Sequence, residues 1–201
     1  MLHEQASGHF QRGNLEQAEL FAREALKEAE SSLGPGHRAT ELSLSTLAAT
    51  LRLRGKADEA LPLAQRLVAL RTGQYGPEDA STAIALHNNA ETLIALSRFA
   101  EAGVLQSRAL AVFEKKLGAR HIHTATALHN MGAIQLKQAK YEEAEKYLRR
   151  ALAAKEKALT PGHLSIAHTL DNLATALDGQ DRQIEAERLR RRAEAIRRKA
   201  K

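Results

Sequence analysis

The side chains with the clearest chemical potential are two His-Asn pairs, His87-Asn88 in ALHNNA and His129-Asn130 in ALHNMG. An imidazole can act as a general base or bind a metal ion, and a carboxamide can donate and accept hydrogen bonds. The chain has no Cys, and no Ser stands in a GxSxG turn. It also has no HExxH segment and no glycine-rich phosphate loop. We therefore expect no catalytic residues and no enzyme activity.

The segments that carry these pairs belong to a 42-residue repeat that runs through the chain without insertion. The same register aligns the segments GNLEQA, GKADEA, SRFAEA, AKYEEA and DRQIEA. It places alanine at five equivalent positions: Ala18, Ala60, Ala102, Ala144 and Ala186. Agreement at several points of one register indicates a tandem array, in which the two His-Asn pairs occupy equivalent positions of neighbouring units.

Each repeat unit has the hydrophobic pattern of two helices. In the fourth unit, apolar residues at helical spacing predict a first helix at about 122–138 and a second at about 141–158. The small residues Gly132 and Ala144 would let these two helices approach closely. Segments rich in Gly and Pro would end each second helix.

A single hairpin of this kind cannot bury its apolar faces, so neighbouring hairpins must stack. We predict an all-α fold in which five hairpins, with about ten helices, form a right-handed α-solenoid. This solenoid would be a single domain over residues 1–201, with units at approximately 1–38, 39–80, 81–122, 123–164 and 165–201.

The composition favours a soluble protein, with 43% hydrophobic and 27% charged residues. No apolar run approaches the ~18 residues that span a bilayer, and the N-terminus lacks the pattern of a signal peptide. We therefore expect a cytoplasmic protein without a membrane span. The net charge of +6 resides in residues 182–201, because residues 1–181 are neutral overall.

The segment ALHNMGAIQLKQAKYEEAEKYLRRAL resembles the tetratricopeptide repeat (TPR), with glycine in the first helix and tyrosine before an acidic pair and alanine. The 42-residue period and the segment GARHIHTATALHNMG are similar to the longer variety found in kinesin light chains. This resemblance implies an adaptor or scaffold that holds a peptide or a partner protein in its concave groove. It also implies that the asparagines equivalent to Asn88, Asn130 and Asn172 face the bound peptide.

First helices line the concave face in this family, and helical spacing indicates which of their residues point into the groove. A carboxamide can pair with both the N–H and the C=O of an extended peptide, so three equivalent asparagines would form a ladder. Alternatively, these asparagines hydrogen-bond adjacent helices. The predicted groove residues are Thr46, Ile84, His87, Asn88, Glu91, Thr126, His129, Asn130, Lys137, His168, Asp171 and Asn172.

The histidines do not form the pattern of a metal site. His87 and His129 are one repeat apart, or ~10 Å, which is too far for one ion with bonds of ~2.0 to 2.1 Å. His129 and His168 can approach more closely, but neither has a carboxylate at i+4. We expect no metal and no cofactor. Residues at the loop-to-helix junctions recur in register and are predicted to cap the following helices: His37, Asp79, His121 and His163.

Asn89 stands where neighbouring units have Leu47, Met131 and Leu173. An amide at a core position is unfavourable unless it is hydrogen-bonded. Asn89 is therefore either satisfied locally or shifted toward a surface.

The C-terminal segment RLRRRAEAIRRKAK suggests an alternative function, because a basic stripe can neutralise phosphates of nucleic acid or an anionic surface. No aromatic residue is interleaved for base stacking, and cations are favourable at a helix C-terminus in any case. An acidic partner protein is a further option, as is self-association through an uncapped solenoid end, which would give a homo-oligomer. The basic residues of this stripe are Arg188, Arg191, Arg192, Arg198 and Lys199.

Overall fold

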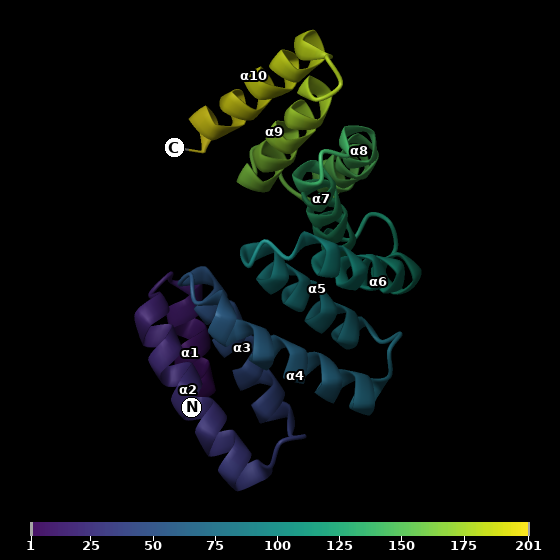
Figure 1. Ribbon diagram of the computed structural model, residues 1–201. Coiled ribbons are helices and arrows are strands. Elements are labelled where there is room, and N and C mark those ends of the chain that lie inside the picture. Colours follow the sequence, from purple (N-terminus) through teal and green to yellow (C-terminus); the bar gives the residue numbers. More distant parts are fainter. Residues whose placement is uncertain (1, 201) are drawn as a thin grey trace. The chain divides into compact units, whose positions relative to one another are not determined.

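The computed structural model describes residues 2–200, and this range forms ten α-helices and no strand (Figure 1). The predicted all-α fold of five hairpins is confirmed. The helices of the fourth unit lie within one residue of their predicted bounds. The ten helices are α1 (Leu2–Gln11), α2 (Leu15–Leu33), α3 (Arg38–Leu53), α4 (Ala57–Tyr75), α5 (Ala80–Ala95), α6 (Phe99–Leu117), α7 (Ile122–Lys137), α8 (Tyr141–Ala158), α9 (Leu164–Asp178) and α10 (Gln183–Lys199).

The contacts divide the chain into two compact units, and the division falls inside α6, between Glu101 and Ala102. In the first unit each helix from α1 to α4 packs on the next one along the chain. The first helices of successive hairpins also touch there, α1 against α3 and α3 against α5. In the second unit α7, α8, α9 and α10 pack in chain order, and α7 also touches α9. Each unit therefore has the stacking of a helical repeat protein.

Four helices of the array begin with the same kind of cap. The Nδ1 atoms of His37, His121 and His163 accept hydrogen bonds from the backbone N–H two residues on, over 3.1 to 3.2 Å. Asp79 accepts the equivalent bond from Ser81 N over 2.7 Å. A side chain that accepts from a free N–H at a helix start stabilises the helix, typically by ~1 kcal/mol. The predicted capping role of these residues is confirmed.

The turn inside each hairpin contains one residue with positive φ. The five residues are in register: Gly13, Gly55, Ser97, Ala139 and Asp181. This left-handed conformation is unstrained for glycine but unfavourable for a residue with a Cβ atom. The first two turns therefore use the residue that suits the conformation, and the last three do not.

The helices of the fourth hairpin approach closely at Gly132, as predicted. A Cβ atom at this position would lie 2.4 Å from Cγ of Leu148, which is fully buried on α8. Leu148 also belongs to a core cluster with Ala144, Leu173 and Leu177. The glycine therefore makes room for a large side chain of the facing helix.

Asn89 remains in the interior. Its exposed fraction is 4%, and its Oδ1 atom has no hydrogen-bond partner among the described residues. Of the two alternatives, displacement toward the surface is therefore excluded, and the carbonyl oxygen of this amide is unsatisfied.

Candidate functional site

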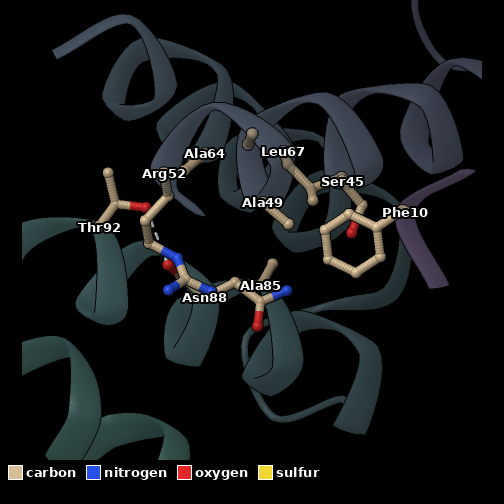
Figure 2. A pocket seen from close by; sticks show the side chains of 10 residues that line it. Phe10, Ser45, Ala49, Arg52, Ala64, Leu67, Ala85, Asn88 and Thr92 are labelled. Atoms are coloured by element: carbon tan, nitrogen blue, oxygen red, sulfur yellow. Dashed lines mark hydrogen bonds between the residues drawn. The ribbon is translucent and has the colours of Figure 1, made fainter. Parts of the chain in front are cut away.

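A pocket of about 220 Å³ lies in the first unit among helices α1, α3, α4 and α5 (Figure 2). Its floor is built largely from small apolar side chains: Ala48, Ala49, Ala64, Leu67 and Ala85. The remaining lining residues are Phe10, Ser45, Arg52, Asn88 and Thr92. Alanine at four of the ten lining positions leaves space that larger side chains would fill. Figure 2 shows Phe10 beside Ser45 at one end, with Arg52 and Thr92 at the other.

Asn88 projects into this pocket with its carboxamide free. Thr92 Oγ1 donates to the backbone oxygen of Asn88 over 3.1 Å, which leaves the side chain out of that bond. No hydrogen bond within residues 2–200 involves the Asn88 side chain. Its amide can therefore donate two hydrogen bonds and accept others from a molecule in the pocket.

The charged end of the pocket is an ion pair. Arg52 Nη2 lies 2.8 Å from Glu91 Oε2, and the Arg52 side chain is 23% exposed. His87 is buried, and its Nε2 atom lies 3.6 Å from the other carboxylate oxygen of Glu91. The carboxylate therefore balances the Arg52 charge inside the pocket, and His87 lies behind Glu91.

His129 lies in a polar network of the second unit that joins three helices. Thr169 Oγ1 is 3.1 Å from His129 Nδ1 and accepts a hydrogen bond from Lys155 Nζ over 2.9 Å. Asn172 Nδ2 is 3.4 Å from His129 Nε2. Because an amide nitrogen can only donate, Nε2 must accept and the proton of a neutral His129 belongs on Nδ1. Asn172 is thus used within the protein, as the alternative to the asparagine ladder anticipates.

The protonation states follow from burial. Burial lowers the pKa of His129 to about 3, with further lowering by the charges of Lys155 and His168. Burial also lowers the pKa of Lys155 to about 8. At neutral pH the imidazole is uncharged and Lys155 still carries its proton, so the network holds one positive charge.

The other predicted groove residues lie in several environments. Thr46, Ile84, Thr126 and Asn130 are half-buried, whereas Lys137 and His168 are exposed. Thr126 Oγ1 donates to Ile122 O over 2.9 Å, and Asp171 forms an ion pair with Arg197. Of the twelve residues, Asn88 lines the pocket and Glu91 pairs with a lining residue, whereas His129 and Asn172 meet in the second unit.

The basic residues of α10 are largely paired with carboxylates. Arg192 pairs with Glu156 of α8, and Arg190 and Arg197 pair with Asp178 and Asp171 of α9. Within α10 itself, Arg191 pairs with Glu187 and Arg198 with Glu194. These contacts neutralise much of the positive charge that the sequence concentrates in this helix. Arg188 and Lys199 have exposed side chains on the same helix.

Residues 2–200 contain neither a cluster of metal ligands nor a membrane-spanning helix. Among the described residues, no group of three or more His, Asp or Glu side chains is placed to hold a metal ion. No helix within the same range is long and apolar enough to cross a membrane.

The comparison with known families decides the classification. Residues 1–73, 81–157 and 140–199 match the tetratricopeptide repeat family. The chain belongs to the tetratricopeptide repeat family. No curated protein sequence matches this TPR chain closely enough to be counted as a relative.

Several solved structures share the fold of this chain. A putative kinesin light chain with nearly identical TPR-like repeats from Podosopora anserina superposes with a TM-score of 0.81 at 24% identity, covering 99% of this chain and 94% of that one. BtubC (BKLC) from P. vanneervenii gives 0.79 at 22% identity and coverages of 97% and 78%. A Rap protein complexed with Competence and Sporulation Factor gives 0.76 at 18% identity and coverages of 97% and 53%. The predicted kinesin-light-chain-like fold is confirmed.

Among the residues of these sites that sequence reasoning missed, two carry a charge, Arg52 and Lys155. The positions equivalent to Arg52 hold Phe10, Ile94, Leu136 and Asp178, so three are apolar and a charge in the second hairpin was only a weak signal. The positions equivalent to Lys155 hold Ala29, Arg71 and Phe113. This mixture of small, charged and aromatic residues indicates neither a core nor a surface position. The burial of Lys155 follows from packing against α9 and was not readable from α8 alone.

Proposed function

We propose that this TPR protein is a non-enzymatic interaction module that binds an extended segment of a partner protein in the pocket of the first unit. TPR domains are in general protein-interaction modules. The observation that supports the proposal is the free carboxamide of Asn88 above a floor of alanines. An adaptor or scaffold role in the cytoplasm follows as part of the same proposal.

The pocket chemistry suits a peptide backbone with a modest apolar side chain. The Asn88 amide can pair with the N–H and the C=O of an extended strand without requiring a given side chain. The alanine floor and Phe10 leave room for an apolar group, whose burial contributes about 25 cal/mol per Å². Arg52 is balanced by Glu91, so a strongly acidic side chain would have to compete with that carboxylate.

The fold comparisons support the class of ligand but not its identity. The Rap protein that superposes on this chain was solved in complex with Competence and Sporulation Factor. A related arrangement of helices therefore holds a partner in at least one case. The identity between the two chains is 18%, so the proposal for this protein rests on its own pocket.

Peptides selected from a random display library against the whole chain provide the test. Asn88→Ala should weaken binding of a selected peptide by about tenfold, the effect of losing one or two well-made hydrogen bonds. Asn172→Ala is the matched control, because this equivalent asparagine is bonded to His129 and lies outside the pocket. The helical circular dichroism and melting temperature of Asn88→Ala should remain those of the parent.

The lack of cysteine permits a second, independent test. Ser45→Cys places a unique thiol in the pocket, and alkylation with N-ethylmaleimide should abolish binding of the same peptide. Ser107→Cys, at an exposed position of α6, should bind the peptide equally well before and after alkylation. Peptide binding that survives both Asn88→Ala and alkylated Ser45→Cys would refute the pocket as the binding site.

The alternatives from the sequence can be tested on the same preparation. The ion pairs of α10 weigh against nucleic-acid binding, and a filter assay at two salt concentrations measures it directly. Self-association has one feature in its favour, because Ile184 at the start of α10 is 75% exposed. Light scattering across a range of concentrations would reveal a homo-oligomer.

A further inference from the structure

A second cleft in the first unit contains buried polar atoms without partners. It has a volume of about 280 Å³ and lies among α1, α2 and α3. Ser43 is 1% exposed, and neither its Oγ atom nor the buried Nδ1 atom of His3 has a hydrogen-bond partner. Both residues line the cleft. Unpaired polar atoms in the interior are unfavourable, so each such pair requires an explanation.

The 42-residue repeat explains these unpaired atoms. The cleft occupies the same place in the repeat as the polar network of the second unit, which comes three repeats later in the chain. His3 and Ser43 are equivalent to His129 and Thr169, which lie 3.1 Å apart in that network. Ala39 of the cleft is equivalent to Ser165, whose backbone oxygen lies 3.4 Å from Lys155 Nζ. In the second unit, the hydroxyl and the carbonyl therefore share one ammonium group.

The residue that supplies this ammonium group is missing from the first unit. Ala29 occupies the position equivalent to Lys155 and lines the cleft. Compared with Lys155, Ala29 lacks the three outer methylene groups and the terminal nitrogen that would lie between the helices. Ser43 is also smaller by one methyl group than Thr169. The cleft is therefore the space that a lysine side chain fills in the second unit.

The charges around the cleft favour a cation. Glu28 lines it from α2 and is exposed, whereas the equivalent residue of the second unit is the buried Ala154. Glu28 is the one charged side chain among the described residues that line the cleft. Burial lowers the pKa of His3, which favours a neutral imidazole at neutral pH, although nearby Glu4 opposes that shift. A bound cation would thus meet a carboxylate and neutral acceptors.

We propose that this cleft is a binding site for a primary alkylammonium group, such as the side chain of a lysine from a partner. The alkyl chain lies against Ala25 and Ala29, and the ammonium donates to Ser43 Oγ and to the backbone oxygen of Ala39. Glu28 at the rim adds a carboxylate. This site is separate from the peptide pocket, so its failure would leave the proposed function untouched.

A titration with n-butylammonium, followed by ¹H–¹⁵N NMR of the whole chain, tests the proposal. The backbone amides of Ala29, Ala39 and Ser43 should shift in a saturable way, with a dissociation constant on the order of millimolar for so small a ligand. The neutral n-butanol should bind about tenfold more weakly, because it lacks the charge-assisted hydrogen bonds. The capped amino acid N-acetyl-lysine methylamide should cause the same shifts if a lysine side chain fits, and the norleucine equivalent should not.

Two variants locate the binding. Ala29→Lys rebuilds the arrangement of the second unit, so it should raise the melting temperature and abolish the n-butylammonium shifts. Ser43→Ala removes one acceptor and should weaken binding about tenfold. Ser43→Ala decides the matter if Ala29→Lys does not fold. Equal binding of n-butylammonium and n-butanol, shifts that persist in Ala29→Lys, or the absence of shifts at the cleft would each overturn the proposal.

Discussion

Lys155 donates a hydrogen bond from Nζ to Thr169 Oγ1 over 2.9 Å in an interior that leaves the lysine 2% exposed. Its second acceptor is the backbone oxygen of Ser165 at 3.4 Å. Among the described residues, no carboxylate forms an ion pair with this ammonium group. A buried charge that meets only neutral acceptors is stabilised incompletely, which is why its pKa falls to about 8.

Lys155→Met should make stability less dependent on pH in the alkaline range. The folded-state pKa of Lys155, about 8, lies below its unfolded value of 10.5, so between these values the unfolded chain binds the additional proton. Stability of the parent therefore rises with pH across this window. Its unfolding free energy should gain roughly 2 kcal/mol relative to Lys155→Met from pH 7 to 9.5. Urea unfolding at both pH values measures this, and a constant difference would contradict the buried charge.

His129→Asn should make the stability of the protein less dependent on pH in the acidic range. The pKa of His129 is about 3 in the folded protein and 6.5 as a model value, so the unfolded chain takes up the proton first as the pH falls. The stability that the neutral imidazole contributes is present above pH 6.5 and lost toward pH 3. The parent should lose roughly 2 to 3 kcal/mol relative to the variant between pH 7 and 4.5. Parallel pH profiles for the two proteins would show that the interior accepts the imidazolium.

The hairpin turns allow a matched pair of stability measurements. Ala139 has φ of 55° and Gly55, two units earlier, has φ of 76°. Ala139→Gly should stabilise the protein by about 1 kcal/mol, and Gly55→Ala should destabilise it by a similar amount. A Cβ atom at Gly55 would meet no atom within 4 Å, so its effect reports backbone conformation alone. Thermal melts of both variants should move in opposite directions, and shifts of the same sign would refute this explanation.

The close approach in the fourth hairpin predicts a compensating pair of substitutions. Gly132→Ala should destabilise by about 1 to 3 kcal/mol, because the new methyl group overlaps Leu148. Leu148→Ala should destabilise by about 2 to 5 kcal/mol through the cavity it leaves. The second hairpin has Ala48 and Ala64 at these two positions, so the double variant adopts a combination that the chain already uses. A double-mutant cycle should therefore show that the double variant is more stable than the sum of the single effects predicts, and simple additivity would contradict the contact.

Periodicity made the helices predictable. A register that holds across five units averages out the ambiguity of any single segment, so the hairpins and the four cap residues could be read from the sequence. The close approach at Gly132 was also predictable, because a small residue inside an amphipathic helix needs a packing reason. The residue that faces Gly132 was harder to predict, because Leu148 rather than Ala144 fills the space beside this glycine.

The candidate sites were less predictable because equivalent positions have different neighbours. Asn88 and Asn172 share one place in the repeat, yet Asn88 faces an open pocket and Asn172 reaches His129. The sequence alone determined the repeat, its helices and their caps, since these depend on local spacing and hydrogen bonds within a few residues. The tertiary structure decided which polar groups are satisfied, because Lys155 and Thr169 meet only when two helices pack, and the same packing around Ala29 leaves a space.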